Sequence, residues 1–402
     1  MNFETFNFHP SVMAGVRELG YTTPTPIQLQ AIPPIMQGRD VIGLAQTGTG
    51  KTAAFVLPIL ERLRQNQRGC IRALIISPTR ELAEQTCEVA NNLGSRTGLR
   101  SIAVYGGVGM ELQNRELRRG AEIIAACPGR LLDHLWKGTV SLTDLEILVI
   151  DEADRMLDMG FLPDVRNILA CIINKRQTLL FSATMPVGIQ RLAREILQNP
   201  VTVQIDRTLP AKTVSHALYP VQQHLKTNLL TEILNKTKTD SVLIFTRTKH
   251  RAERVAQQLA RAGYPVASLQ GNLSQNQRQA ALTDFRNGSI KILVATDIAA
   301  RGIDILSISH VINYDMPEST DDYIHRIGRT GRVNKNGDAL TFVTSTDAVK
   351  IGALEKLLDK PLERLTLQGF DYARPAPDKQ SGLSQPPRRR FLRENVKQPA
   401  VR

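Results

Sequence analysis

Three carboxylates follow directly after an apolar run in the stretch "LVIDEADRMLD", which extends from Leu148 to Asp158. The run covers residues 147–150, and the carboxylates are Asp151, Glu152 and Asp154. Carboxylates this close repel one another and lose hydration if the apolar run carries them into the interior. A cation must then compensate, and oxygen ligands of this kind suit Mg²⁺. The stretch predicts an acidic site at the end of a buried strand.

A glycine-rich stretch, "AQTGTGKT", fits the spacing GxxxxGKT, with alanine in place of the first glycine. It follows the apolar run "VIGLA" and opens a helical pattern, which is the context of a phosphate-binding loop. Glycines let backbone N–H groups face phosphates, and the helix N-terminus favours the anion. We expect Lys51 to reach the β- and γ-phosphates and the Thr52 hydroxyl to bind Mg²⁺. The predicted phosphate-loop residues are Ala45, Gln46, Thr47, Gly48, Thr49, Gly50, Lys51 and Thr52.

The acidic stretch and the phosphate loop predict two halves of one site. Asp151 would hold Mg²⁺ through water, and Glu152 would orient the attacking water and accept its proton. A solvated helix start is the alternative, because acids favour the helix dipole. That alternative explains acids in a first turn less well when they follow a buried strand directly.

Gln28 follows a proline turn within "GYTTPTPIQLQAIP", residues 20–33. Its amide carries a donor and an acceptor and can therefore pair with the N6/N7 edge of adenine. A proline turn with a helix cap explains the same residues, so the residues alone leave both interpretations open.

Short apolar runs alternate with helical stretches and must position these groups. Strands that are apolar on both faces and alternate with helices indicate parallel sheets. The pattern occurs twice, so we predict an α/β fold of two tandem domains, each a parallel sheet flanked by helices. The expected strands are 41–45, 73–77, 123–127, 147–150, 179–182, 242–246, 266–269, 291–296, 310–314 and 339–343.

Charge and composition set the remaining limits. The chain has 402 residues and a net charge of +13, which favours a polyanionic partner, nucleic acid first. Residues 371–402 hold eight Lys/Arg and three Asp/Glu, a net of +5, which leaves 13 − 5 = +8 for residues 1–370. We place domains at 1–207 and 208–366, with the boundary near 204–215, and a basic low-complexity tail at 367–402 that we expect to be disordered or only partly ordered.

Cysteine spacing and hydropathy indicate the compartment. Cys70, Cys87, Cys127 and Cys171 are far apart and form no CxxC pair, which favours a reducing, cytoplasmic location. The N-terminus lacks the regions of a signal peptide. No run of about 18 apolar residues occurs, so we expect no membrane span.

Ten stretches in a fixed order carry a family resemblance. They are "GYTTPTPIQ", "AQTGTGKT", "PTRELA" (78–83), "GG" (106–107), "CPGR" (127–130), "DEAD" (151–154), "SAT" (182–184), "VLIFTRTK" (242–249), "ATDIAARGID" (295–304) and "HRIGRTGR" (325–332). From about residue 3 to 366, the chain resembles the DEAD-box ATP-dependent RNA helicases of superfamily 2. Its short N-terminus, "FTRTKH" and basic tail are most similar to the bacterial RhlE-type group.

The resemblance implies two RecA-like domains with ATP in the cleft between them. It implies that Phe3, Tyr21 and Gln28 lie at the adenine and that Asp304 touches the ribose. Asp154, Ser182, Thr184 and His325 would couple the ATP site to RNA and to domain closure. Arg329 and Arg332 would act as arginine fingers on the γ-phosphate, a contribution that can be worth on the order of 10³–10⁵ in rate. Fingers on the second domain make hydrolysis depend on closure.

The family's RNA contacts fall on small, hydroxyl and arginine positions. Such groups suit phosphates and 2′-hydroxyls rather than base edges, so we expect sequence-independent binding with a steep salt dependence. Two positions depart from the pattern: Cys127 replaces a threonine, which removes a hydroxyl, and Asn272 replaces an aspartate, which removes a charge. The implied RNA-binding residues are Pro78, Thr79, Arg80, Gly107, Gly129, Arg130, Arg247, Gly271 and Thr296.

The function implied is RNA-stimulated ATP hydrolysis, with Mg²⁺, coupled to local separation of short RNA duplexes or remodelling of RNPs. An ATP-gated RNA clamp or annealing factor fits the same motifs, and a DNA helicase is a third candidate. The basic tail would assist RNA binding, and a passive solubilising end is the alternative for it. Proteins of ribosome assembly or of RNA decay stay open as partners, as does the oligomeric state.

Overall fold

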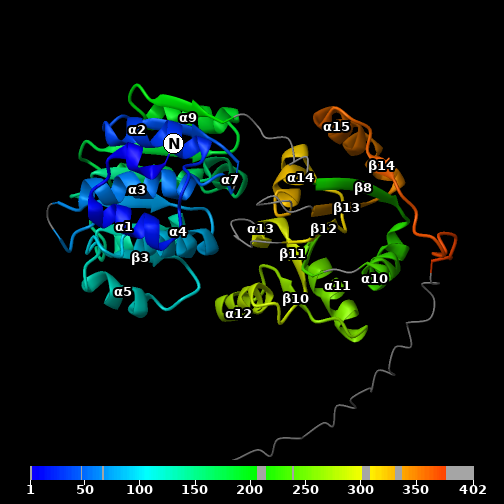
Figure 1. Cartoon of the computed structure of the whole chain (residues 1–402). Coiled ribbons are helices and arrows are strands. Elements are labelled where there is room, and N and C mark those ends of the chain that lie inside the picture. Colours follow the sequence, from blue (N-terminus) through cyan, green and yellow to red (C-terminus); the bar gives the residue numbers. More distant parts are fainter. Residues whose placement is uncertain are drawn as a thin grey trace, which may run out of the picture.

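The computed structural model describes residues 2–46, 48–65, 68–205, 214–237, 240–300, 308–330 and 337–376. These residues form two α/β domains, each built on one seven-stranded sheet (Figure 1). Neighbouring strands within each sheet pair in parallel. Helices cover both faces, which confirms the expected pair of tandem parallel-sheet domains.

The first domain has the strand order β3-β4-β2-β5-β6-β1-β7. Its elements are η1 (Phe3–Phe6), α1 (Pro10–Glu18), α2 (Pro26–Met36), β1 (Val41–Leu44), α3 (Lys51–Leu63), β2 (Ala73–Ile76), α4 (Arg80–Leu93), β3 (Ser101–Val104), α5 (Met110–Arg118), β4 (Ile123–Ala126), α6 (Pro128–Trp136), β5 (Ile147–Ile150), α7 (Ala153–Asp158), α8 (Leu162–Ala170), β6 (Gln177–Ser182), α9 (Val187–Ile196) and β7 (Val201–Gln204).

The second domain has the strand order β10-β11-β9-β12-β13-β8-β14. Its elements are β8 (Val214–Pro220), η2 (Gln223–Leu225), α10 (Lys226–Lys236), β9 (Val242–Thr246), α11 (Lys249–Arg261), β10 (Val266–Leu269), α12 (Gln275–Arg286), β11 (Ile292–Thr296), α13 (Asp297–Ala300), β12 (His310–Asn313), α14 (Thr320–Ile327), β13 (Gly337–Val343), η3 (Ser345–Asp347), α15 (Ala348–Leu358) and β14 (Glu363–Arg364).

The central strands are held by burial on both faces. In β5, every residue from Ile147 to Ile150 is at most 1 % exposed. Ile147 and Val149 pack into one apolar cluster of the domain, and Leu148 and Ile150 pack into the other. Full burial of one such aliphatic side chain contributes roughly 1.5–3 kcal/mol. The apolar run therefore fixes the place where the acidic stretch begins.

Four strands were not predicted from the sequence: β3, β7, β8 and β14. Polar residues interrupt the apolar run in β8, where Ser215 is exposed and His216 is buried. In β7, at the edge of the first sheet, only Val203 is buried. β14 has two exposed residues. Such strands pair because the neighbouring strand offers free N–H and C=O groups, a cause that lies outside their own sequence.

Ordered packing in the second domain continues beyond residue 366, into the segment that we assigned to the tail. Leu367, Phe370 and Tyr372 pack against one of its apolar clusters. The Lys236 Nζ donates to the Gln368 carbonyl at 2.7 Å, and the Leu367 N–H donates to the Tyr372 hydroxyl at 2.9 Å. Apolar side chains within a polar segment supply this anchoring. Residues 377–402 lie outside the described part.

Two further expectations concern the compartment. Among the described residues, no helix combines the length and the apolar character needed to cross a bilayer. All four cysteines are free thiols.

Candidate active site

The strand order separates the candidate residues of the first domain into two groups. β1, β6 and β5 are neighbours in the sheet and lead into the stretches 45–52, 182–184 and 151–154. β2, β4 and β3 are also neighbours and lead into 78–80, 127–130 and 106–107. Carboxyl ends of parallel strands meet at one edge of a sheet. The edge therefore has a half for the predicted nucleotide residues and a half for the predicted RNA residues.

The phosphate loop turns at its glycines. Gly48 has a φ of 84° and Gly50 a φ of 91°, values that residues with a side chain rarely adopt. The Thr49 hydroxyl donates to the Gln46 carbonyl at 2.7 Å and closes the turn. Gly50 leads directly into α3, so the first N–H groups of that helix face the loop. Thr47 lies outside the described residues.

Lys51 places a buried charge beside the acidic stretch. Its side chain is only 6 % exposed, and its charge acts on Asp151, Glu152 and Asp154. Among the described residues, no carboxylate oxygen lies within 4 Å of the Lys51 Nζ. The ammonium group is therefore close enough to influence the acids and is not tied to one of them, which suits a phosphate ligand.

Asp151 is a buried carboxylate that is only partly compensated. It is 2 % exposed, and its Oδ1 accepts the Glu152 N–H at 2.9 Å. Burial raises the pKa of Asp151 to about 6, although the Lys51 charge opposes the shift. A divalent cation would relieve this cost, so the chemistry of this carboxylate and of the Thr52 hydroxyl in the first turn of α3 suits Mg²⁺. Among the described residues, no group of three or more His, Cys, Asp or Glu side chains is placed to hold a metal ion.

Glu152 sits in a backbone conformation that is unusual for its residue type. Its φ and ψ are both 51°, the left-handed region, and it forms the N-terminal boundary of α7. The side chain is buried and forms an ion pair with Arg155. Burial alone would raise the pKa of Glu152, but Arg155, Lys51 and Arg329 together lower it. The carboxylate is therefore held in its ionised form.

Asp154 connects α7 to the end of β6. Its Oδ2 accepts the Thr184 N–H at 2.8 Å, the Thr184 hydroxyl at 3.0 Å and the Ala183 N–H at 3.2 Å. Its own N–H donates to the Ser182 hydroxyl at 3.1 Å. Burial opposes the charge of Asp154, yet Lys51 and these hydrogen bonds lower its pKa. Three of the four residues predicted to couple the sites thus form one hydrogen-bonded unit.

The second domain presents cations to this acidic cluster. α14 of the second domain faces α7 of the first (Figure 1). The charge of Arg329 contributes to the lowered pKa of Glu152, and that of His325 to the lowered pKa of Asp154. Arg329 is 3 % exposed. Asp304 and Arg332 lie outside the described residues.

Polar contacts between the domains occur at the starts of α4 and α12. The Arg278 Nε donates to Glu81 Oε1 at 2.8 Å, and the Arg80 Nη1 donates to Gln275 Oε1 at 3.4 Å. Glu81 is 8 % exposed, so this is a buried contact. The domains therefore meet beside the predicted RNA residues as well as at the predicted nucleotide site.

The predicted adenine residues pack around the N-terminal segment. Phe3 is 2 % exposed, and its ring centroid lies 6.1 Å from that of Tyr21. Gln28 Oε1 accepts the Thr25 N–H at 2.9 Å, and its Nε2 donates to the Gly50 carbonyl at 3.1 Å. A side chain at position 50 would collide with the Gln28 amide. Gln28 is thus a helix cap and a direct link to the phosphate loop, and its amide keeps one further donor and one further acceptor position.

The predicted RNA residues of the first domain support one another. The Thr79 hydroxyl accepts the Leu82 N–H at 3.3 Å and caps α4. The Arg80 guanidinium lies over Gly107, whose φ is 89° and where a Cβ would be 2.0 Å from Arg80 Nη1. The Arg130 Nη1 donates to the Val108 carbonyl at 2.9 Å. Pro78 is buried, whereas Gly129 at the start of α6 is exposed.

The predicted RNA residues of the second domain lie at the ends of β9, β10 and β11, which are also neighbours in their sheet. Arg247 is exposed, and its Nε lies 2.8 Å from Glu318 Oε1. Gly271 is exposed, and Thr296 is half-buried at the end of β11. Both sheets therefore offer the ends of three adjacent strands.

The two departures from the family pattern have different surroundings. Cys127 precedes α6 without a side-chain hydrogen bond to the helix, and burial raises the pKa of its thiol to about 12. The expected hydroxyl interaction at this position is therefore replaced by apolar packing. Asn272 Oδ1 accepts a hydrogen bond from the Lys249 Nζ at 2.9 Å.

Several buried charged residues at the site were not singled out from the sequence. They include Glu81, Arg155 and Arg326, which forms a bidentate ion pair with Asp297 at 2.6 and 2.7 Å. The half-buried Arg278 was also not singled out. Glu81, Arg155, Arg326 and Asp297 lie within or next to stretches that the sequence singled out. The sequence offered one signal for these residues, which was a charged residue within a stretch that was expected to be buried.

Family models cover most of both domains. Residues 25–192 match the family described as DEAD/DEAH box helicase, and residues 225–334 match the family described as helicase conserved C-terminal domain. Each match includes the strand ends that carry the candidate residues of its domain.

Curated relatives extend the match to nearly the whole chain. The present chain is 42% identical over 363 residues to the DEAD-box ATP-dependent RNA helicase RhpA of Helicobacter pylori (strain B128). The match covers 90% of the chain and 73% of that relative. It is 40% identical over 373 residues to the ATP-dependent RNA helicase DeaD of Buchnera aphidicola. That match covers 92% of the chain and 62% of the relative, so the chain spans less than two thirds of DeaD.

Solved structures of one homologue match most of this chain. S. cerevisiae Dbp5 bound to RNA and ADP BeF3 matches with a TM-score of 0.82 at 31% identity, over 90% of this chain and 95% of that one. A Dbp5 variant bound to Nup159, Gle1, IP6 and ADP matches with a TM-score of 0.64 at 30% identity, over 89% and 95%. This chain therefore shares the two-domain fold of that homologue over most of both chains.

Proposed function

This chain belongs to the DEAD-box ATP-dependent RNA helicases, and on that basis we propose that it couples RNA-stimulated ATP hydrolysis to the local, non-processive separation of short RNA duplexes or the remodelling of RNPs. The observation that supports this proposal is that predicted nucleotide and RNA residues of the first domain face charged residues of the second domain. Glu152 and Asp154 are influenced by Arg329 and His325, and Arg278 bonds to Glu81. A ligand that binds only the joined domains shifts the population towards that state.

The nucleotide would be held mainly by the first domain. The phosphate-loop N–H groups and Lys51 would bind the phosphates, and the Gln28 amide would pair with adenine near Phe3 and Tyr21. Asp304 would contact the ribose. Gln28 already bonds to the carbonyl of Gly50, so recognition of the base is mechanically linked to the loop that holds the phosphates.

Hydrolysis would depend on residues from both domains. Thr52 and Asp151 would hold Mg²⁺, which stabilises negative charge on the phosphate oxygens when bound. Glu152 would orient the attacking water and accept its proton, and Arg329 with Arg332 would stabilise the charge that spreads over the transferred phosphoryl group. Asp154, Ser182, Thr184 and His325 would transmit the state of the site between the domains.

RNA would be held by the ends of β2, β3 and β4 and of β9, β10 and β11. The groups there are hydroxyls, glycines and arginines, which recognise the backbone and not the base sequence. A single strand gripped across both domains would depart from A-form geometry, and this would break base pairs locally. We also propose a place in the RhlE-type group, a cytoplasmic location, and partners from ribosome assembly or RNA decay.

Strand displacement with a short RNA duplex tests the proposal. ATP should support displacement, and the Glu152→Gln variant should bind ATP and RNA but stall before phosphate release. A chain that holds RNA with ATP and never displaces a strand would be a clamp or annealing factor. Stimulation of ATP hydrolysis by DNA as well as by RNA would favour a DNA helicase and contradict the proposal.

A further inference from the structure

Arg155 lies one turn along α7 from Glu152, and its side chain returns to that carboxylate. The Arg155 Nη1 donates to Glu152 Oε2, and the two side chains are 3 % and 4 % exposed. The backbone supports this arrangement, because the Arg155 N–H donates to the Glu152 carbonyl at 3.0 Å and to Asp154 Oδ1 at 3.1 Å. The ion pair is therefore inside the acidic cluster of the nucleotide site.

The same guanidinium is incompletely satisfied. Its Nη2 is buried and has no hydrogen-bond partner among the described residues. Burying a charge is costly unless all of its donors are paired, and a buried ion pair often contributes nothing to stability relative to apolar side chains. Stability is therefore a poor explanation for an arginine at this position.

The backbone at Glu152 gives a second, independent indication. A left-handed conformation of a residue other than glycine costs on the order of 1–3 kcal/mol and persists only where the surroundings hold it. The conformation directs the Glu152 side chain, and Arg155 then fixes the end of that side chain. Two separate constraints thus act on one carboxylate.

We propose that Arg155 is a positioning residue for ATP hydrolysis, holding Glu152 by Oε2 so that Oε1 stays available to the attacking water. The inference rests on the proposed role of Glu152. In the step concerned, the water oxygen bonds to the γ-phosphorus, and the bond to the β–γ bridging oxygen breaks with its electron pair left on ADP. The proton of the water passes to Glu152 Oε1 and is later released to solvent. The guanidinium keeps its charge throughout, because arginine is not deprotonated in proteins.

Arg155→Met removes the fork and keeps most of the volume, and Arg155→Lys keeps the charge without the planar geometry. With saturating RNA, single-turnover hydrolysis by Arg155→Met should fall by about 10²-fold, the lower end of a general-base contribution. The dissociation constants of ATP and of RNA with a non-hydrolysable analogue should change by less than about threefold, because Arg155 acts on the chemical step. Arg155→Lys should recover part of the rate.

A double mutant separates positioning from a general structural effect. Residues that act as a unit are strongly non-additive, so Arg155→Met should slow Glu152→Gln by less than about twofold. Arg72→Met is the matched control: Arg72 is a buried arginine of the same domain whose Nε lies 2.6 Å from Glu146 Oε1, remote from the nucleotide site. That variant should lose stability without a change in rate per folded molecule.

These experiments distinguish failure of the inference about Arg155 from failure of the proposed function. Unchanged hydrolysis in Arg155→Met, an equal loss in the Glu152→Gln background, or a loss explained by weaker ATP binding overturns the inference and leaves the proposed function in place. Wild-type hydrolysis in Glu152→Gln overturns the proposed role of Glu152 and the inference with it. If Arg155→Met does not fold, Arg155→Lys decides, and a rate equal to that of the wild type overturns the inference.

Discussion

Arg278 of the second domain donates a hydrogen bond to Glu81 of the first domain, with 2.8 Å between Arg278 Nε and Glu81 Oε1. The two side chains are 14 % and 7 % exposed. Glu81 belongs to the first turn of α4, directly after the predicted RNA residues Thr79 and Arg80. The contact therefore joins the domains beside the predicted RNA residues and not among the predicted nucleotide residues.

Breaking this ion pair should weaken the coupling between RNA binding and ATP hydrolysis. Loss of one partner leaves a buried charge without compensation, which typically costs about 3–5 kcal/mol. Arg278→Met should lower kcat/KM for RNA in the ATPase assay by at least about tenfold, because the joined state becomes rarer. Exchanging the charges, with Glu81→Arg and Arg278→Glu together, should restore part of the loss. Arg166→Met, which breaks an exposed pair with Glu195, is the control, and an equal effect there would refute the argument.

Lys51→Ala should abolish ATP hydrolysis. The substitution removes the phosphate ligand and also leaves Asp151, Glu152 and Asp154 with less compensating charge. Phosphate release with saturating RNA should fall to background, and ATP binding should weaken. Lys175→Ala, at an exposed position of the same domain, should behave like the wild type. Near-normal turnover in Lys51→Ala would rule out the phosphate-loop assignment.

Gln28→Ala should reduce the preference for ATP over GTP. The amide is the group that can distinguish the edge of adenine, and its loss also leaves the Thr25 N–H without its acceptor. Removal of such a cap should cost about 1 kcal/mol of stability, measured by thermal unfolding. The ratio of kcat/KM for ATP and GTP checks the recognition of adenine. A stability loss with an unchanged ratio would leave Gln28 as a cap only.

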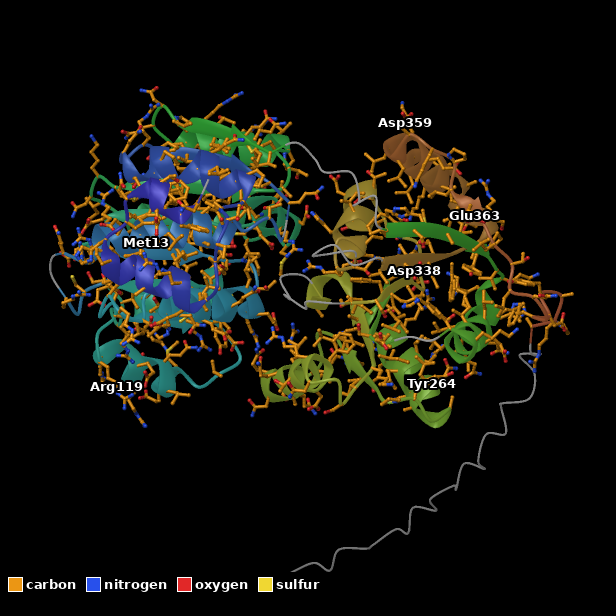
Figure 2. All side chains as sticks on the ribbon, in the orientation of Figure 1. Met13, Arg119, Tyr264, Asp338, Asp359 and Glu363 are labelled. Atoms are coloured by element: carbon orange, nitrogen blue, oxygen red, sulfur yellow. The ribbon has the colours of Figure 1, made fainter. Side chains whose placement is uncertain are left out.

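The second domain should lose stability in mild acid because of His216. The His216 side chain forms a hydrogen bond with the Tyr323 hydroxyl. It lines a cavity of about 550 Å³ together with Asp338 and Glu363, which are labelled in Figure 2. Burial, with a smaller effect of Lys360, lowers the pKa of His216 to about 4, against about 6.5 in the unfolded chain. The unfolded chain therefore binds the proton first, and the contribution present above pH 6.5 is lost as the pH falls towards 4.

Urea unfolding at pH 7.5 and at pH 5.0 measures this effect. One such group accounts for a difference of about 2 kcal/mol between these pH values. His216→Gln should reduce the pH dependence by about that amount, whatever its effect on stability at pH 7.5. His250→Gln, at an exposed position of α11, should leave the pH dependence unchanged. Equal slopes for wild type and His216→Gln would contradict the prediction.

Removing residues 377–402 should weaken RNA binding and make it less sensitive to salt. The segment holds seven Lys/Arg and two Asp/Glu, and each phosphate contact contributes roughly 0.7–0.9 to the slope of log K against log salt. The deletion starts after Ala376 because Phe370 and Tyr372 belong to the folded domain. A variant that keeps the tail but replaces Arg388, Arg389, Arg390 and Arg393 by Gln separates charge from length. Unchanged slopes in both variants would make the tail a passive end.

The sequence alone determined the parts of this protein in which neighbouring residues act together. A phosphate loop needs its glycines, lysine and threonine within eight positions, and the acids after β5 follow one another directly. Buried strands can also be recognised in the sequence, because both of their faces must be apolar. The sequence did not predict four strands, β3, β7, β8 and β14. Their own residues do not specify a strand, and pairing with a neighbouring strand stabilises them instead.

The tertiary structure decided which distant groups meet. Arg278 and Glu81 are 197 residues apart, and their contact depends on how the two domains sit together. The order of strands in each sheet, which the chain order does not reveal, separates the predicted nucleotide residues from the predicted RNA residues along the edge. Arg155 lies only three residues from Glu152, yet its contact required a left-handed turn at Glu152. Spacing in the chain specifies local chemistry, whereas burial and side-chain direction arise only when the whole domain packs.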